Sequence, residues 1–128
     1  MKYNPSIHHR RTIRLKGYDY SKQGLYFITI CSKNYKHVLG EIAGSKLISS
    51  RYGKIVQEEL LKLPKRFADI SINNYVIMPN HIHLIIQMYC DNKNVLGNII
   101  KTYKSVTTLR CNNIDKLKNV SIWRPQLF

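Results

Sequence analysis

Two histidines separated by one apolar residue are the side chains whose types and spacing could do chemistry most directly. His81 and His83 follow a Pro-Asn dipeptide at 79–80 and begin an apolar run that ends at Met88. Successive side chains on a β-strand point to opposite faces, so both imidazoles would share one face, with their backbones roughly 6–7 Å apart. Two such imidazoles can bind one metal ion from one side and leave its other positions open, which is typical of a catalytic metal.

The same spacing also fits sites without a metal, because the two rings could lie on a solvated sheet edge or pair within a core. The dipeptide favours an accessible site, since Pro fixes φ and Asn tolerates turn geometry. Gln87 shares the face of the histidines but lies too far along the strand to join them easily. Asp69 and Asp91 are the nearest acids, and neither falls clearly on that face.

The elements that must position this pair are mostly strands. Residues 70–78 alternate between apolar and polar, and the tight 79–80 connection predicts an antiparallel pair with the strand of the histidines. Leu25–Ser32 is predicted to be a central strand covered on both faces. Val38–Ile42 and Lys46–Ser49 are predicted to form a hairpin around Ala43-Gly44-Ser45.

Two helices complete the predicted fold. The first should run from Arg51 to Leu63, capped by Ser50 and ended near Pro64. The second should run from Val95 to Cys111, capped by Asn94. Each carries an apolar stripe at helical spacing, which we assign to packing. The order strand, hairpin, helix, strand, strand, helix predicts an α+β fold, an antiparallel sheet with helices on one face.

The composition indicates a basic, single-domain protein. The 128 residues suffice for one core. A formal net charge of +14, from 21 Lys and Arg against 7 Asp and Glu, favours a polyanionic partner, and nucleic acid over an acidic membrane. No apolar run of about 18 residues predicts a membrane span. Three widely spaced cysteines suggest neither a disulfide framework nor a zinc knuckle, so reduced thiols in the cytoplasm are expected.

Two basic segments are candidates for contact with phosphates. Residues 1–22 are predicted to be an N-terminal arm that interleaves Lys and Arg with tyrosines suited to stacking on bases. One face of the second helix could form a further phosphate track. The DNA-binding residues predicted in this way are Arg10, Arg11, Arg14 and Lys16 in the arm, and Lys101 and Lys104 on the helix.

Residues 78–86, Met-Pro-Asn-His-Ile-His-Leu-Ile-Ile, resemble the His-hydrophobe-His (HUH) signature of single-tyrosine transposases. The whole chain resembles the REP-associated tyrosine transposases more closely, because three further regions agree in order. These regions are residues 10–20 with 24–31, residues 96–105, and residues 122–123. The resemblance implies a ferredoxin-like sheet with the histidines on a central strand, a homodimer, and DNA held along the sheet.

The resemblance also implies a chemistry. His81 and His83 would be catalytic ligands of a divalent metal, Mg²⁺ or Mn²⁺, that assists cleavage of single-stranded DNA carrying hairpins. Imidazole is a softer ligand than oxygen, which favours Mn²⁺. In the family, a tyrosine forms a covalent 5′-phosphotyrosyl link and the DNA is then rejoined.

The sequence departs from this family in its last region. The nucleophilic tyrosine should follow the region of Trp123, yet no tyrosine follows Tyr103. Tyr103 fits the apolar stripe of its helix, so we do not expect it to replace the nucleophile. Residues 23–128 are therefore expected to be a transposase-like HUH domain, truncated before the tyrosine helix, that binds DNA without strand transfer. Two alternatives are a non-catalytic nucleic-acid-binding module and a metal-dependent nuclease that uses a metal-bound water.

Overall fold

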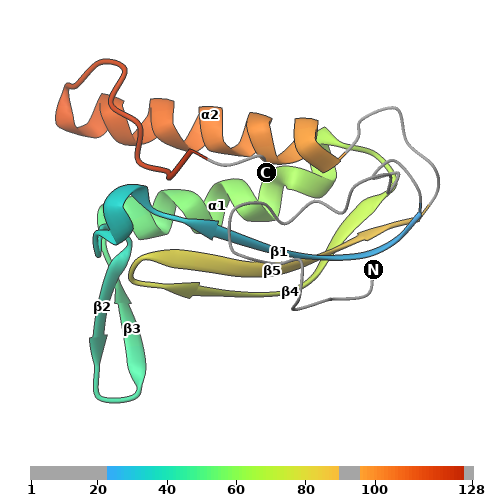
Figure 1. The fold of residues 1–128 in the computed structure, drawn as a ribbon, viewed down its shortest axis with the longest axis horizontal. Helices are drawn as coiled ribbons and strands as arrows, with labels where there is room; N and C mark the ends of the chain where they lie inside the picture. Colours follow the sequence, from blue (N-terminus) through green and yellow to red (C-terminus); the bar gives the residue numbers. More distant parts are fainter. Residues whose placement is uncertain (1–22, 90–95, 126–128) are drawn as a thin grey trace.

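The computed structural model describes residues 23–89 and 96–125. They form a three-stranded antiparallel sheet, a separate two-stranded hairpin, and two helices that cover one face of the larger sheet (Figure 1). The predicted α+β class is confirmed. The elements in order are β1 (Gly24–Cys31), the short 3₁₀ turn η1 (Lys33–Tyr35), β2 (Gly40–Ala43), β3 (Lys46–Ser49), α1 (Arg51–Arg66), β4 (Ile70–Met78), β5 (His81–Met88) and α2 (Leu96–Asp115).

The strand that carries the histidines is the central one. The sheet order is β1-β5-β4, with both pairings antiparallel, and β2 pairs with β3 as predicted. The prediction of a central strand at Leu25–Ser32 is wrong, because β1 is an outer strand of this sheet and its second face is open. Phe27, on that face, is 56% exposed. Apolar residues on both faces of a strand are compatible with a covered or an exposed second face. This pattern therefore does not predict whether another layer packs on that face.

The core lies between the sheet and the helices. Alternate residues of β1 and β5 point toward the helices, where the apolar stripes of α1 and α2 meet them. Burying these side chains is the main stabilising term of a domain of this size. The fully buried members include Ile30, Leu60, Leu63, Ile82, Ile86, Met88, Ile99, Ile100 and Tyr103.

Helix α1 begins where predicted and ends later. The backbone N–H of Gly53 donates to Oγ of the capping residue Ser50, at 3.0 Å. The helix was expected to end near Pro64, but it continues to Arg66 and closes with a bond from the Phe67 N–H to the Leu63 carbonyl, at 2.9 Å. Proline lacks an N–H donor and its ring crowds the carbonyl four residues earlier, but in the last turn of this helix these costs do not stop it.

Helix α2 is longer than predicted at its C-terminal end. It extends to Asp115, one turn beyond Cys111, while its predicted start at Asn94 and Val95 lies outside the described residues. The chain then returns along the outer edge of β1, where Trp123 forms a bridge with Ser32. The Trp123 ring is buried, and its Nε1 donates to Oγ1 of Thr107, at 2.8 Å. Neither described helix is long and apolar enough to cross a membrane.

Candidate metal centre

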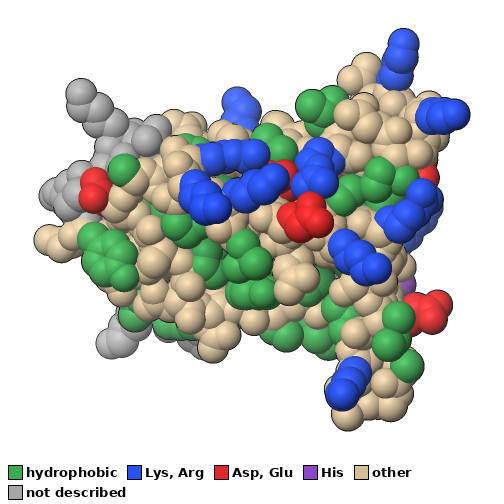
Figure 2. All heavy atoms as spheres, turned by 180° about the vertical axis from the view of Figure 1, so that it is seen from behind, with side chains coloured by type: hydrophobic (Ala, Val, Ile, Leu, Met, Phe, Trp, Pro, Cys, Tyr) green, Lys and Arg blue, Asp and Glu red, His purple; other side chains and the backbone are tan. Residues whose placement is uncertain are grey.

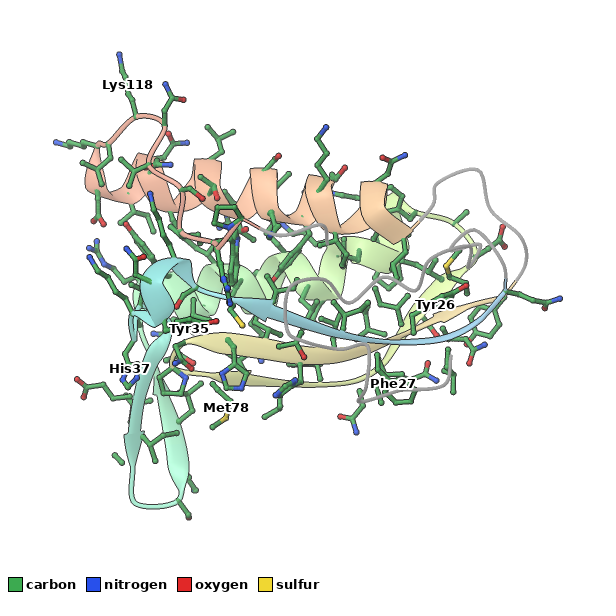
Figure 3. All side chains as sticks on the ribbon, in the orientation of Figure 1. Tyr26, Phe27, Tyr35, His37, Met78 and Lys118 are labelled. Carbon is green, nitrogen blue, oxygen red and sulfur yellow. The ribbon has the colours of Figure 1, made fainter. Side chains whose placement is uncertain are left out.

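His81 and His83 lie on the face of the sheet that the helices leave open. The intervening Ile82 is fully buried on the opposite face. The two ring centroids are 4.6 Å apart, and the ring planes meet at 76°. Figure 3 shows Met78 and Phe27 projecting from this open face, away from the helices. Two rows of residues cross the sheet here in register, Thr29–His83–Val76 and Cys31–His81–Met78.

A hydrogen bond at Nδ1 orients each imidazole. The Nδ1 of His81 lies 2.7 Å from the side-chain oxygen of Asn80, and the Nδ1 of His83 lies 2.9 Å from the hydroxyl of Thr29. An amide oxygen only accepts, so Nδ1 of His81 carries the proton and Nε2 keeps its lone pair. The Thr29 hydroxyl can donate or accept, and we assign His83 the tautomer in which Nδ1 donates to it. With this assignment both Nε2 atoms can act as metal ligands, each ring having an oxygen partner at Nδ1.

The surroundings of His81 favour its neutral ring. Burial lowers the pKa of His81 below its ordinary value of 6.5, and the neighbouring charge of His83 lowers that pKa further. Both causes act by disfavouring the charged form. A metal ion binds only the neutral imidazole, so the surroundings of His81 already favour the protonation state that a metal needs.

The described part of the chain supplies two candidate metal ligands at this place. Among residues 23–89 and 96–125, no group of three His, Cys, Asp or Glu side chains could hold a metal ion. Asp69 therefore does not join the histidines, and Asp91 lies outside the described residues. Gln87 is four residues beyond His83 and lies between Leu25 and Ser71 in the register. The residues present fit an ion that is held from one side.

Tyr103 is enclosed in the core on the other side of the sheet. Its hydroxyl donates to the carbonyl of Val56, at 2.7 Å, and its ring lies beside that of Trp123. Burial raises the pKa of Tyr103 well above 10, and the negative charge of Glu59 adds to this effect. A phenol that is buried, bonded and hard to ionise is poorly suited to attack a phosphate.

Two of the six predicted DNA-binding residues, Lys101 and Lys104, lie among the residues that the structure describes. Arg10, Arg11, Arg14 and Lys16 lie outside the described residues. Lys101 is exposed on α2. Lys104 is partly buried, and its Nζ donates to the Arg124 carbonyl, at 3.1 Å; burial lowers its pKa. Figure 2 shows Lys and Arg side chains gathered around acidic ones over the helices.

Three residues at or beside the pair, Thr29, Tyr35 and Arg124, were not predicted from the sequence. Asn80 was named only for its turn geometry, and not as a hydrogen-bond partner of His81. Thr29 could be found only from the register between β1 and β5. Tyr35 and Arg124 are 89 positions apart, so no local pattern links them.

Comparisons with known proteins agree with this architecture. A family model described as "Transposase IS200 like" matches residues 20–128. An uncharacterized protein of Haemophilus influenzae (strain Rd) is 45% identical over 87 residues, which is 68% of this chain and 48% of that protein. The chain thus spans about half the length of this relative.

Two solved structures share the fold. One is a REP-associated tyrosine transposase bound to a REP hairpin, with a TM-score of 0.61 and 20% identity. It is matched over 88% of this chain and 58% of its own. The other is a protein of Deinococcus radiodurans described as a candidate transposase, with a TM-score of 0.57 and 15% identity, matched over 88% of this chain and 80% of its own.

Proposed function

Because this chain belongs to the IS200-like transposase family, we propose that it binds single-stranded DNA at the open face of its sheet. His81 and His83 would hold a divalent metal ion there. The observation that carries this proposal is the pair of neighbouring imidazoles on the central strand, each with a hydrogen-bond partner at Nδ1. The net charge of +14 supports a nucleic-acid partner.

The proposed metal is Mg²⁺ or Mn²⁺, and the two imidazole ligands favour Mn²⁺ of these two. When bound, a divalent ion would stabilise negative charge on the oxygens of a phosphodiester. The chain's own contribution is to hold the ion and to fix the ligands. Asn80 and Thr29 would restrict rotation of the two rings, so both imidazoles would be oriented before the metal ion binds.

The proposed partner is single-stranded DNA that carries hairpins, and the proposed assembly is a homodimer. The family relationship and the structurally similar transposase bound to a REP hairpin support the DNA part. Residues 1–22 would contribute phosphate contacts as a basic arm before the domain at 23–128. Lys101 would add a contact from α2.

This 128-residue polypeptide is proposed to bind DNA without forming a phosphotyrosyl link. No tyrosine follows Tyr103 in the sequence, and Tyr103 is enclosed among core side chains. Incubation with hairpin-bearing single-stranded DNA and Mn²⁺, followed by a denaturing gel, should show no covalent adduct. An adduct that disappears in Tyr103→Phe would contradict the proposal.

A non-catalytic nucleic-acid-binding module is the second candidate function. It is favoured by the finding that, within the described ranges, no third His, Cys, Asp or Glu side chain joins the two histidines.

Titration calorimetry with Mn²⁺ distinguishes a metal-binding protein from a module that binds nucleic acid alone. The metal proposal predicts one binding event that is lost in His81→Ala combined with His83→Ala. It predicts an unchanged event in His37→Ala, which removes an exposed histidine outside the pair.

A titration that gives no heat with the unaltered protein, or equal heat with the double variant, would favour the binding module. DNA binding measured on the same samples by fluorescence anisotropy keeps the two questions apart. A protein that binds DNA but no Mn²⁺ fits the module, whereas a protein that binds neither contradicts both functions.

A further inference from the structure

We propose that Tyr35 and Arg124 form a clamp for a nucleotide beside the metal centre, which deepens and rests on the proposed function. The Arg124 guanidinium would bind a phosphate, and the Tyr35 ring would stack on a base. We call this pair the Tyr35–Arg124 clamp. Single-stranded DNA suits such a site, because every base offers a π-face and every linkage offers a charged phosphate.

The two side chains already contact each other. The guanidinium carbon of Arg124 lies 5.1 Å from the centroid of the Tyr35 ring, and Nη1 donates to the Tyr35 hydroxyl. Tyr35 is 50% exposed. No carboxylate in the described ranges lies within ion-pair distance of Arg124. A guanidinium has five N–H donors, so Arg124 retains donors for a phosphate.

The turn that presents Tyr35 is strained. Asn34 and Tyr35 both have left-handed backbones, with φ of 56° and 55°. A bulky residue rarely adopts this conformation, and such residues cluster at ligand-binding sites. Two contacts hold the turn in place. The Tyr35 N–H donates to the Ser32 carbonyl, at 3.1 Å, and the side-chain amide of Asn80 donates to the Tyr35 carbonyl, at 3.5 Å.

The clamp is adjacent to the histidines. Asn80 contacts Tyr35 through its nitrogen and His81 through its oxygen. The Arg124 N–H donates to the Cys31 carbonyl, at 2.9 Å, and Cys31 is the register partner of His81. Two strand spacings therefore separate the Arg124 and His81 backbones, or about 10 Å. That separation spans about three stacked nucleotides of one strand.

The local charge also suits DNA. Lys33 and Lys36 flank the exposed ring of Tyr35 in sequence, and neither forms an ion pair with an acidic side chain of the described residues. Figure 3 shows Tyr35 at the end of the sheet from which the β2–β3 hairpin projects, the end that also carries Met78. A strand that lies across the histidines would reach this basic end.

The test is fluorescence anisotropy with a labelled, mixed-sequence single strand of about 12 nucleotides, without added metal. Arg124→Gln should weaken binding about tenfold and reduce the salt slope by about 0.7. Lys118→Gln is the matched control, because it removes one positive charge at the tip of the structure away from the sheet (Figure 3). It should change affinity by less than about twofold.

Tyr35→Leu should weaken binding at least about fivefold, whereas Tyr35→Phe keeps the stacking ring and should stay within about twofold. Each variant is checked for Mn²⁺ binding, which should be unchanged, so that loss of the fold is not mistaken for loss of the clamp. Equal effects of Arg124→Gln and Lys118→Gln, or full affinity in Tyr35→Leu, would overturn the clamp and leave the proposed function intact. An unaltered protein that does not bind the strand would overturn both.

Discussion

At the scale of single residues, the chemistry of the candidate metal centre depends on which nitrogen each imidazole leaves free. Each Nδ1 has an oxygen partner, Asn80 for His81 and Thr29 for His83, and Nε2 is available when Nδ1 is the donor in both bonds. Partners of this kind typically contribute a factor of about 10 to 100 to metal affinity. Thr29→Val, which keeps the shape and removes the hydroxyl, should therefore weaken Mn²⁺ binding about tenfold, as measured by calorimetry.

The matched control is Thr29→Ser, which restores the hydroxyl and should recover most of the affinity. Asn80→Ala should act on His81 in the same direction as Thr29→Val acts on His83. If Thr29→Val and Thr29→Ser bind Mn²⁺ equally well, the hydroxyl does not position the ring, and the assigned tautomer of His83 loses its support.

Residue types could predict the histidine pair but not its supports. The spacing of His81 and His83 fixes a shared face on any strand, so a single-sequence argument suffices. Thr29 becomes a partner only through the register of two strands that are 54 positions apart in the chain. No local sequence pattern predicts the Tyr35–Arg124 clamp, because the left-handed backbone of its turn cannot be inferred from the side-chain types.

At the scale of elements, one buried carboxylate joins the two helices. The Glu59 side chain on α1 is 2% exposed and forms ion pairs with Arg66, at 2.8 Å, and with Arg110 of α2, at 2.9 Å. Burial alone would raise the pKa of Glu59, but the hydrogen bond from Arg110 and the charges of Arg66 and Lys62 outweigh it and hold the pKa below 4.5. Glu59 is therefore ionised at neutral pH.

Glu59→Gln should lower the free energy of unfolding by about 1 to 2 kcal/mol, because the neutral amide loses the charge-assisted hydrogen bonds to Arg66 and Arg110, whose partly exposed guanidinium groups water can then solvate. A depressed carboxyl pKa stabilises the folded state above the unfolded value of 4.5, and this contribution is lost as the pH falls through the folded value. The unaltered protein should thus lose more stability below pH 4.5 than Glu59→Gln does. Urea unfolding at neutral and acidic pH measures both quantities.

The neighbouring Glu58 provides the control for this experiment. Its side chain is 57% exposed and pairs with Arg110 at 3.0 Å. An exposed pair contributes at most about 1 kcal/mol, so Glu58→Gln should have a small effect at either pH. Equal losses in Glu58→Gln and Glu59→Gln would show that the buried carboxylate does not join the helices as described.

Element types could be read from the sequence more reliably than their ends and neighbours. The alternation in β4 and β5 and the Ser50 cap of α1 are local signals, and both are confirmed. The ends of α1 and α2 were placed too early, because tertiary packing carries a helix past a proline or a polar residue. The outer position of β1 depends on which strand pairs with which, and no periodicity contains that information.

At the scale of the whole molecule, a formal charge of +14 should make the affinity for DNA strongly dependent on salt concentration. Neutralising phosphates releases counterions, so the affinity for a single strand should fall linearly with salt concentration on logarithmic axes. A slope between about −3 and −6 would correspond to roughly four to eight phosphate contacts. Anisotropy titrations at several salt concentrations give the slope, and a slope near zero would contradict a nucleic-acid partner.

The two faces of the molecule differ in character. The helices close one face of the sheet and enclose Tyr103, while the other face presents the histidines beside exposed apolar side chains. The family and the fold relate this arrangement to transposases. The proposed metal centre and the Tyr35–Arg124 clamp would together place one strand across the end of the sheet that carries His81.

Pulsed electron paramagnetic resonance of bound Mn²⁺ tests the central claim most directly, because it detects nitrogen atoms that coordinate the ion. Protein labelled with ¹⁵N-histidine should show imidazole nitrogen couplings that are retained in His37→Ala. The couplings should be lost when His81→Ala and His83→Ala are combined. A spectrum without nitrogen couplings in the unaltered protein, or with couplings that persist in the double variant, would contradict a metal centre at His81 and His83.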